Sequence, residues 1–245
     1  MWRYPVKGLS GERLEQAEVA AGGGLPFDRV LALLHGTAEF DPAAPAFLPK
    51  SNFLVLARHP RLAALATLFD PQSRVLEVRR GGKTVCRADL SQPMGATVLE
   101  QFFAAYMNGE LRGRVRLVEA PGHRFFDVPQ TGLTLLNLAS VRDLERVVGR
   151  PVDPARFRAS LWIEGLPAWQ EFGWVGRSIA IGGVRLAITG RVDRCAATNV
   201  SPATAEVDMN IPKALMQGYG HVDMAVYATV ETGGRLVAGA ALAVA

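Results

Sequence analysis

The sequence predicts a mainly β protein of the α+β class, in which a smaller mixed β/α N-terminal domain precedes a strand-rich second half. Short apolar segments bounded by turn residues recur along the chain, and several flank Gly-Gly pairs of the kind found in hairpins. Strands and helices do not alternate regularly, which argues against a doubly wound parallel sheet. The second half consists mostly of short strands, a pattern more typical of a barrel.

The composition is that of a globular protein with one large domain or two small ones. The chain has 245 residues, of which 49% are apolar and 20% charged; this excludes a disordered or coiled-coil protein. A chain of this length buries a full core without disulfides. Its two cysteines, Cys86 and Cys195, are too few for a disulfide framework or for the about four thiolates of an iron–sulfur cluster.

Charge and hydropathy predict a cytoplasmic protein that has no nucleic acid or membrane as a partner. Lys and Arg number 27 and Asp and Glu 23, a net charge of +4, which permits an anionic ligand without requiring one. The sequence contains no nucleic-acid-binding motif. Residues 1–7 lack the apolar region of a signal peptide, and the longest apolar run, AGAALAVA, is shorter than the roughly 18 residues of a transmembrane helix.

The first half, residues 1–120, is predicted to be the mixed β/α domain. Two apolar segments, 14–20 and 28–34, enclose Gly22-Gly23-Gly24, which indicates a wide hairpin. The other predicted elements are a proline-rich loop at 40–50, a short helix over 61–69, a hairpin of 74–79 and 83–89, a helix over 96–107 and a strand at 114–119.

A composition break near residue 120, at Pro121, Gly122 and Pro129, marks the predicted start of a second domain, residues 121–245. Ser140 and Asp143 resemble a capping box, which predicts a helix over 141–148. The strands predicted in this half are 133–136, 157–163, a hairpin over 178–188, and 222–230 and 235–244 around Gly233-Gly234.

Cys195 is the main candidate for chemistry. It directly follows Arg194 and lies close to Arg191, and nearby cations favour the thiolate, which is both the nucleophile and the metal ligand. The alternative is a buried free cysteine, a common fate of this residue. Cys86 lies in a predicted strand, where a structural role is the better interpretation.

Four cations stand beside apolar strands: Lys7, Arg29, Arg158 and Arg194. If they converged near Cys195 they would form an anion site, since arginine suits phosphate well; solvated surface charges are the alternative, and spacing alone does not decide. His221 could bind or position a ligand, or could be a hydrogen-bonded structural histidine. Hydrolase and zinc motifs are absent from the sequence.

One ordered set of short motifs spans the chain. It comprises Tyr4-Pro5-Val6-Lys7, Asp28-Arg29, Leu136–Ser140, Arg156–Ser160 with Glu164-Gly165, Arg194-Cys195 with Thr198, and Gly220–Asp223 with Val226-Tyr227. This set resembles the MOSC family, which is related to the C-terminal part of molybdenum cofactor sulfurases, and within it the amidoxime-reducing component group. The resemblance implies a MOSC N-terminal β-barrel domain over 1–120 and a MOSC-type β-barrel domain with short helices over 121–245.

The resemblance also implies the cofactor and its ligands. It implies the molybdenum cofactor, molybdopterin, with Cys195 as the ligand of molybdenum; a thiolate is a soft ligand that suits this metal. The cofactor-binding residues that it implies are Lys7, Arg29 and Arg158 around the pterin phosphate and pyran ring, Ser140 and Arg194 as hydrogen-bonding residues, and Ser160. Pyridoxal phosphate binding belongs to the wider family only.

Four positions depart from the family pattern. Ser160 stands where Asn is usual, Asp193 where Ser or Thr is frequent, Ala225 where Gly is usual, and Ala240 where the family has the Asp of a closing Gly-Asp pair. A carboxylate at Asp193 disfavours an anionic cofactor unless it points away or pairs with Arg191.

The activity implied by the resemblance is the reduction of N-hydroxylated small molecules at molybdenum. Cys195, His221 and Asp223 are the expected catalytic residues, the last two for proton delivery. The sequence carries no flavin, haem or nicotinamide fingerprint, so we expect an external flavin or iron–sulfur electron donor. Two alternatives are a sulfur carrier with a persulfide on Cys195, which would need a desulfurase partner, and a non-catalytic module that stores the cofactor.

Overall fold

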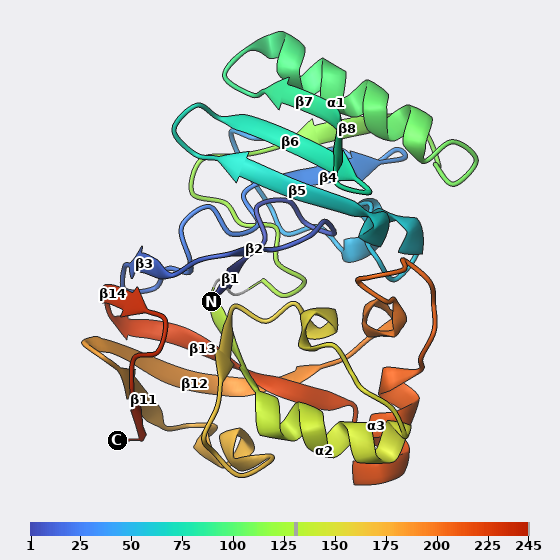
Figure 1. Cartoon of the computed structure of the whole chain (residues 1–245). Coiled ribbons are helices and arrows are strands. Elements are labelled where there is room, and N and C mark those ends of the chain that lie inside the picture. Colours follow the sequence, from blue (N-terminus) through green and yellow to red (C-terminus); the bar gives the residue numbers. More distant parts are fainter. Residues whose placement is uncertain (130–131, 245) are drawn as a thin grey trace.

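The computed structural model describes residues 1–129 and 132–244 and has two stacked β-rich halves (Figure 1). The upper half holds β5, β6, β7, β4, β8 and α1, and the lower half holds the largest sheet with α2 and α3. The N-terminal strands lie between them. The predicted mainly β, α+β class is confirmed.

Most of the regular structure consists of short strands. They are β1 (Trp2–Arg3), β2 (Glu12–Arg13), β3 (Gln16–Val19), β4 (Ala32–His35), β5 (Leu65–Asp70), β6 (Val75–Arg80), β7 (Lys83–Asp89), β8 (Val115–Val118), β9 (Leu133–Asn137), β10 (Leu161–Ile163), β11 (Ser178–Ile181), β12 (Val184–Asp193), β13 (Asp223–Thr232), β14 (Gly234–Val237) and β15 (Leu242–Val244).

The helices are short. The α-helices are α1 (Pro93–Tyr106), α2 (Leu138–Val148) and α3 (Ile211–Tyr219). The 3-10 helices are η1 (Lys50–Asn52), η2 (Pro60–Ala64), η3 (Pro154–Phe157), η4 (Gln170–Trp174) and η5 (Ala196–Asn199). In the described part of the chain, no helix combines the length and the apolar character that crossing a bilayer requires.

The upper half is an antiparallel sheet, β5-β6-β7, packed with α1 and the β4–β8 pair around one apolar core. Burial alternates along β5, as expected for a strand with one face in the core. Helix α1 begins at Pro93, a favoured first position, and buries Leu99 and Phe103. The predicted hairpin of 74–79 and 83–89 and the predicted helix over 96–107 are confirmed as β6–β7 and α1.

The lower half is a six-stranded sheet in the order β10-β9-β13-β12-β11-β15. The β9–β10 pair is parallel, and the other neighbours are antiparallel. Helices α2 and α3 contact each other and cover a second cluster of apolar residues. The predicted hairpin over 178–188 is confirmed as β11–β12.

The N-terminal segment belongs to both halves. Strand β3 pairs with β14 near the C-terminal end, and Ala17, Val19 and Leu25 pack into the core of the large sheet. Strand β4 instead pairs with β8. The predicted wide hairpin of 14–20 and 28–34 is therefore wrong, because each strand finds a better partner far away in the sequence.

Four predicted boundaries also differ from the structure. The helix predicted over 61–69 is wrong: the segment forms η2 followed by β5. Leu65, Thr67 and Phe69 are buried in alternation with exposed residues, which is the pattern of a strand with one face in the core. Helix α2 begins earlier than predicted, since Asn137 rather than Ser140 caps it by accepting from the amide of Ala139. The strand predicted at 157–163 shortens to β10, and the one at 235–244 divides into β14 and β15.

We predict that Gly8→Ala lowers the free energy of unfolding more than Gly122→Ala does. Both glycines have a left-handed backbone, with φ of 83° and 73°, so alanine is strained at each by about 1–2 kcal/mol. A Cβ at Gly8 would in addition lie 2.3 Å from the carbonyl oxygen of Leu54, whereas none of the described atoms lies within 4 Å of a Cβ at Gly122. Chemical denaturation of both variants isolates the effect of the contact with the Leu54 carbonyl oxygen. Equal losses in the free energy of unfolding would contradict this prediction.

A second prediction concerns acid stability and rests on His35. This buried ring packs edge-on against His59 at 5.3 Å between centroids, and burial, with His59 and two arginines, lowers its pKa to about 4. Between about pH 6.5 and pH 4, His35 is protonated in the unfolded chain but stays neutral in the folded chain. The free energy of unfolding therefore falls as the pH drops through this range. Denaturation at pH 7 and pH 5 should give a smaller difference for His35→Phe than for the unmodified chain; an equal difference would exclude His35 as a source of acid sensitivity.

Candidate functional site

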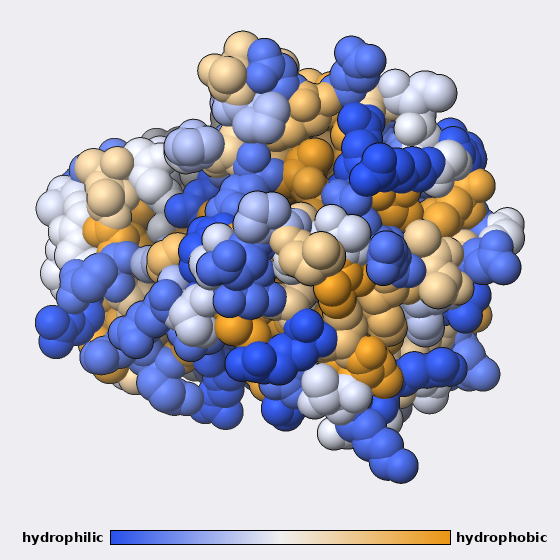
Figure 2. Space-filling model, turned by 90° about the horizontal axis from the view of Figure 1, so that it is seen from above, coloured by the Kyte–Doolittle hydropathy of each residue, from blue (hydrophilic) through white to orange (hydrophobic). Residues whose placement is uncertain are grey.

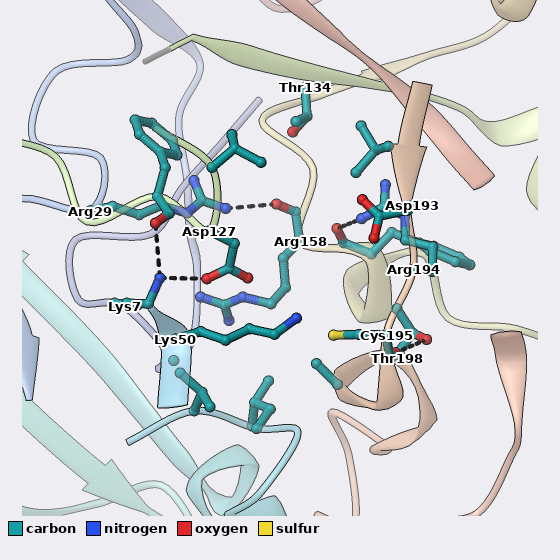
Figure 3. A pocket seen from close by; sticks show the side chains of 18 of the residues that line it. Lys7, Arg29, Lys50, Asp127, Thr134, Arg158, Asp193, Arg194, Cys195 and Thr198 are labelled. Atoms are coloured by element: carbon teal, nitrogen blue, oxygen red, sulfur yellow. Dashed lines mark hydrogen bonds and ion pairs between the residues drawn. The ribbon is translucent and has the colours of Figure 1, made fainter. Parts of the chain in front are cut away.

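A cavity of about 180 Å³, open to solvent on one side, lies where the two halves meet and gathers residues from both (Figure 3). Residues from the N-terminal half line it together with residues from the end of β12 and from η3 and η5. Its polar and reactive lining residues are Lys7, Arg29, Lys50, Asp127, Thr134, Arg156, Arg158, Asp193, Arg194, Cys195, Thr198 and Tyr227.

Lys7 is buried at one wall of the cavity. Its ammonium donates to the carbonyl oxygens of Phe125 and Phe126, at 3.0 and 3.1 Å, and forms an ion pair with Asp127. Burial lowers the pKa of Lys7, although Asp127 opposes the shift. Burial also acts to raise the pKa of Asp127, but the charge and hydrogen bond of Lys7 outweigh it, so the carboxyl pKa is lowered.

Arg29 and Arg158 share the ring of Tyr4. Their guanidinium carbons lie 5.0 and 4.3 Å from its centroid, within the range of a cation–π contact. Arg29 Nη2 donates to the carbonyl oxygen of Arg158 at 3.1 Å, and Arg158 Nη1 donates to that of Leu9 at 2.5 Å. Burial lowers the pKa of Arg158 to about 10, so it remains protonated at neutral pH.

Both of these arginines have a left-handed backbone, with φ of 52° at Arg29 and 50° at Arg158. A non-glycine residue rarely adopts this conformation, and it costs about 1–2 kcal/mol at each position. Such strain persists where the surroundings fix the residue, which is common at functional sites. Five other described non-glycine residues also have positive φ, so the strain supports a functional role for the two arginines only together with their position in the cavity.

Arg194 joins strand β13 to the 3-10 helix η3 at the cavity wall. Its Nε donates to the carbonyl oxygen of Met224 at 2.7 Å, and Nη1 donates to that of Phe157 at 2.9 Å. Burial lowers its pKa to about 10. Most of its hydrogen-bonding capacity is thus used by the backbone, and it contributes mainly positive charge to the cavity.

Cys195 follows Arg194, the first residue after β12, and directly precedes η5; its sulfur projects into the cavity (Figure 3). Its carbonyl oxygen accepts from Thr198 Oγ1 at 2.9 Å, which fixes the turn that carries the thiol. Cys86 is buried in β7, where burial raises its thiol pKa. The two thiols therefore differ as predicted: one faces the cavity, and the other is part of the core.

Two of the predicted cofactor-binding residues, Ser140 and Ser160, lie outside the residues that line the cavity. Ser140 is fully buried, donates to Glu171 and accepts from the amide of Trp169. Ser160 is also buried; its amide donates to Thr134 Oγ1 at 3.0 Å. Ser140 therefore fixes η4, and Ser160 acts on the cavity through Thr134, which does line it.

His221 and Asp223 also lie outside the described cavity lining. His221 packs among Trp169, Phe172 and Tyr219, with its Nδ1 accepting from the amide of Asp223 at 3.1 Å. This is the structural alternative for that histidine, and the geometry gives no support to direct proton delivery by the pair.

The side chain of Asp193 does not pair with Arg191. Arg191 approaches Asp223 at 4.0 Å and stacks over Phe172 instead. Asp193 lines the cavity as an exposed carboxylate, so the cavity carries a negative charge that the family pattern does not predict.

Sequence reasoning missed two cations of the cavity. Arg156 is buried, pairs with Asp208 and donates to the carbonyl oxygens of Thr198 and Asn199, so it holds the loop after Cys195. Lys50 extends from η1, at the end of the proline-rich segment. Arg156 lies two residues before Arg158, which the sequence predicts as a site residue, but nothing local in the sequence marks Lys50.

The cavity suits an anionic ligand that binds metal through one thiolate. Its lining has six cationic side chains, Lys7, Arg29, Lys50, Arg156, Arg158 and Arg194, and two carboxylates, Asp127 and Asp193. Within residues 1–129 and 132–244, no cluster of three or more His, Cys, Asp or Glu could hold a metal ion by itself. Cys195 is the one cysteine among the described lining residues, and a thiolate at this position could supply a single ligand to a metal.

Comparison with models of known protein families identifies the family of the chain. Residues 1–115 match the MOSC N-terminal beta barrel domain, and residues 123–243 match the MOSC domain. The chain therefore belongs to the MOSC family, whose members are associated with the molybdenum cofactor. The sequence matches none of the curated proteins with which it was compared.

Several solved structures are similar to the chain. YiiM from Geobacillus stearothermophilus is 19% identical, with a TM-score of 0.37, over 46% of this chain and 53% of its own length. The chain thus spans about half of that protein. APC1665, the YUAD protein from Bacillus subtilis, is 11% identical, with a TM-score of 0.46, over 99% of this chain and 91% of its own.

Proposed function

We propose that this protein binds the molybdenum cofactor in the cavity between its two halves and uses it to reduce N-hydroxylated small molecules. The observation that carries the proposal is the convergence of three buried or half-buried cations, Lys7, Arg29 and Arg158, on the cavity that also receives the thiol of Cys195. These residues come from distant parts of the chain, and their shared location supports one anionic ligand.

In this proposal the two ends of the cofactor would lie at opposite ends of the cavity. Lys7, Arg29 and Arg158 lie on the side away from Cys195 (Figure 3) and would hold the phosphate and pterin. The two guanidinium groups would donate hydrogen bonds to phosphate oxygens, while Lys7, whose three N–H groups already have acceptors, would contribute its charge and the position of the cavity wall. Cys195 would bind the metal. When bound, the cofactor supplies the two-electron redox chemistry, while the protein fixes orientation and charge.

In the proposed reaction the N–O bond of the substrate breaks, two electrons and two protons are consumed, and an amine and water are released. The electrons come from an external flavin or iron–sulfur donor, because the sequence contains no fingerprint of a flavin, haem or nicotinamide site. The protons come from solvent through the open side of the cavity.

We predict that Cys195→Ser abolishes reduction of N-hydroxylated substrates and lowers molybdenum content, because a hydroxyl is a much poorer ligand for a soft site. Cys86→Ala is the matched control and should retain both, with a stability loss of about 1 kcal/mol. Metal analysis and turnover with a chemical reductant, on protein from a host that makes the cofactor, provide the readouts. Full turnover and metal content in Cys195→Ser would refute the coordination.

The same preparation separates the alternatives. A mass increment of one sulfur atom on Cys195 without molybdenum would favour a sulfur carrier that works with a desulfurase partner. Molybdenum at one equivalent without turnover by any reductant would favour a storage module. Each outcome leaves a different species on Cys195, so intact-protein mass and metal content decide between them.

We further predict that Lys7→Ala, Arg29→Ala and Arg158→Ala each reduce the pterin and molybdenum retained on purification. A charge-assisted hydrogen bond contributes roughly 1.5–3 kcal/mol, so each loss lowers affinity about tenfold or more. Arg185→Ala is the control, because Arg185 is exposed on β12 and pairs with Glu231 away from the cavity. Normal cofactor content in all three variants would remove the basis of the proposed site.

A further inference from the structure

Lys50 differs from the other cations of the cavity in having no partner. Each of the others is engaged by the protein, Lys7 by Asp127, Arg29 by Asp28, Arg156 by Asp208, Arg158 by Leu9 and Arg194 by Phe157 and Met224. Within the described chain, Lys50 forms neither a side-chain hydrogen bond nor an ion pair. Its charge is therefore available to a ligand.

The base of Lys50 is held firmly although its side chain is exposed. It opens η1, whose backbone is closed by the bond from the Phe53 amide to the Lys50 carbonyl oxygen at 3.2 Å. Phe53 is buried and bridges to Leu34 of β4, and Arg112 Nη2 donates to the carbonyl oxygen of Ser51 at 2.5 Å. The lysine thus projects from a fixed point on the cavity rim.

The amine of Lys50 points across the cavity toward the sulfur of Cys195 (Figure 3). Its side chain starts beside Lys7, on the side of the cavity opposite Cys195, and extends across the space toward that sulfur (Figure 3). The carboxylates that face the same space are Asp127, which Lys7 neutralises, and Asp193, which stands beside Arg194. Lys50 is therefore positioned for the reacting end of a ligand, and Asp193 is the charge that opposes it.

We propose that Lys50 is a specificity-determining residue that captures a negatively charged group of the molecule approaching Cys195. The site would accordingly prefer small N-hydroxylated compounds that carry a carboxylate over neutral ones. This assignment rests on the proposed function for the identity of the substrate. The attraction of anions to Cys195 follows from the charge distribution, because an unpaired cation in a cleft concentrates anions there.

The attraction can be measured without the cofactor through the reactivity of Cys195. In a Cys86→Ala background, the rate of thiol modification by dithionitrobenzoate, a dianion, is divided by the rate for neutral dithiodipyridine. The same thiolate attacks the disulfide bond of both reagents, so any change in thiolate fraction cancels in the ratio. We expect Lys50→Gln to lower this ratio about fivefold at low salt, Lys50→Arg to preserve it, and added salt to erase the difference.

Asp193→Asn provides a control of opposite sign. Removal of this carboxylate should raise the ratio, while Arg185→Gln, remote from the cavity, should leave it unchanged. A ratio that Lys50→Gln does not alter, or alters equally at high and low salt, would overturn the proposal.

The loaded enzyme then tests whether the captured anion is the substrate. Lys50→Gln should keep its molybdenum, raise KM for a carboxylate-bearing N-hydroxylated compound about tenfold, and leave kcat/KM for a neutral one unchanged. Loss of molybdenum from Lys50→Gln would instead make Lys50 a cofactor ligand and overturn the substrate assignment. Absence of molybdenum from the unmodified protein would overturn the proposed function, whereas anion capture would still be decided by the reagent ratio.

Discussion

The contact of Arg29 and Arg158 with the ring of Tyr4 is the constraint on which the site depends. The two arginines come from opposite halves of the chain, and the bond from Arg29 Nη2 to the Arg158 carbonyl oxygen joins those halves directly. Both backbones are left-handed, a conformation that only surrounding contacts can maintain. The same contacts therefore join the halves and bring two cations into the cavity, so the site depends on the packing of the halves against each other.

The N-terminal segment strengthens this coupling. The amide of Trp2 donates to the Ser160 carbonyl oxygen, and β3 pairs with β14. Lys7 follows β1 and reaches Asp127 on the segment that connects the halves. The cavity thus lies at an interface between the halves that backbone hydrogen bonds and ion pairs hold together. These contacts fix the distance from the cationic wall to Cys195. A rigid interface suits a cofactor that must be oriented at both ends.

Much of the fold could be predicted locally, and the errors share one cause. The hairpins β6–β7 and β11–β12 were predictable because their strands are adjacent and their turns are Gly-Gly pairs. The hairpin predicted from 14–20 and 28–34 failed because its strands pair with β14 and β8, and no local pattern reports such long-range pairing. The capping role predicted for Ser140 failed for a similar reason: Asn137 caps the helix, and Glu171 and Trp169 engage Ser140.

The sequence alone determined the mainly β class, the MOSC family and the residue types of the site, because these depend on composition, periodicity and an ordered set of motifs. Tertiary structure decided which of those residues meet. It placed Lys7, Arg29, Arg158, Arg194 and Cys195 in one cavity and left His221 among aromatic rings outside it. It also brought Lys50 opposite Cys195. The convergence of these side chains depends on how strands far apart in the chain pair and pack. That pairing is determined by residues throughout the core and not by the sequence around any one site residue.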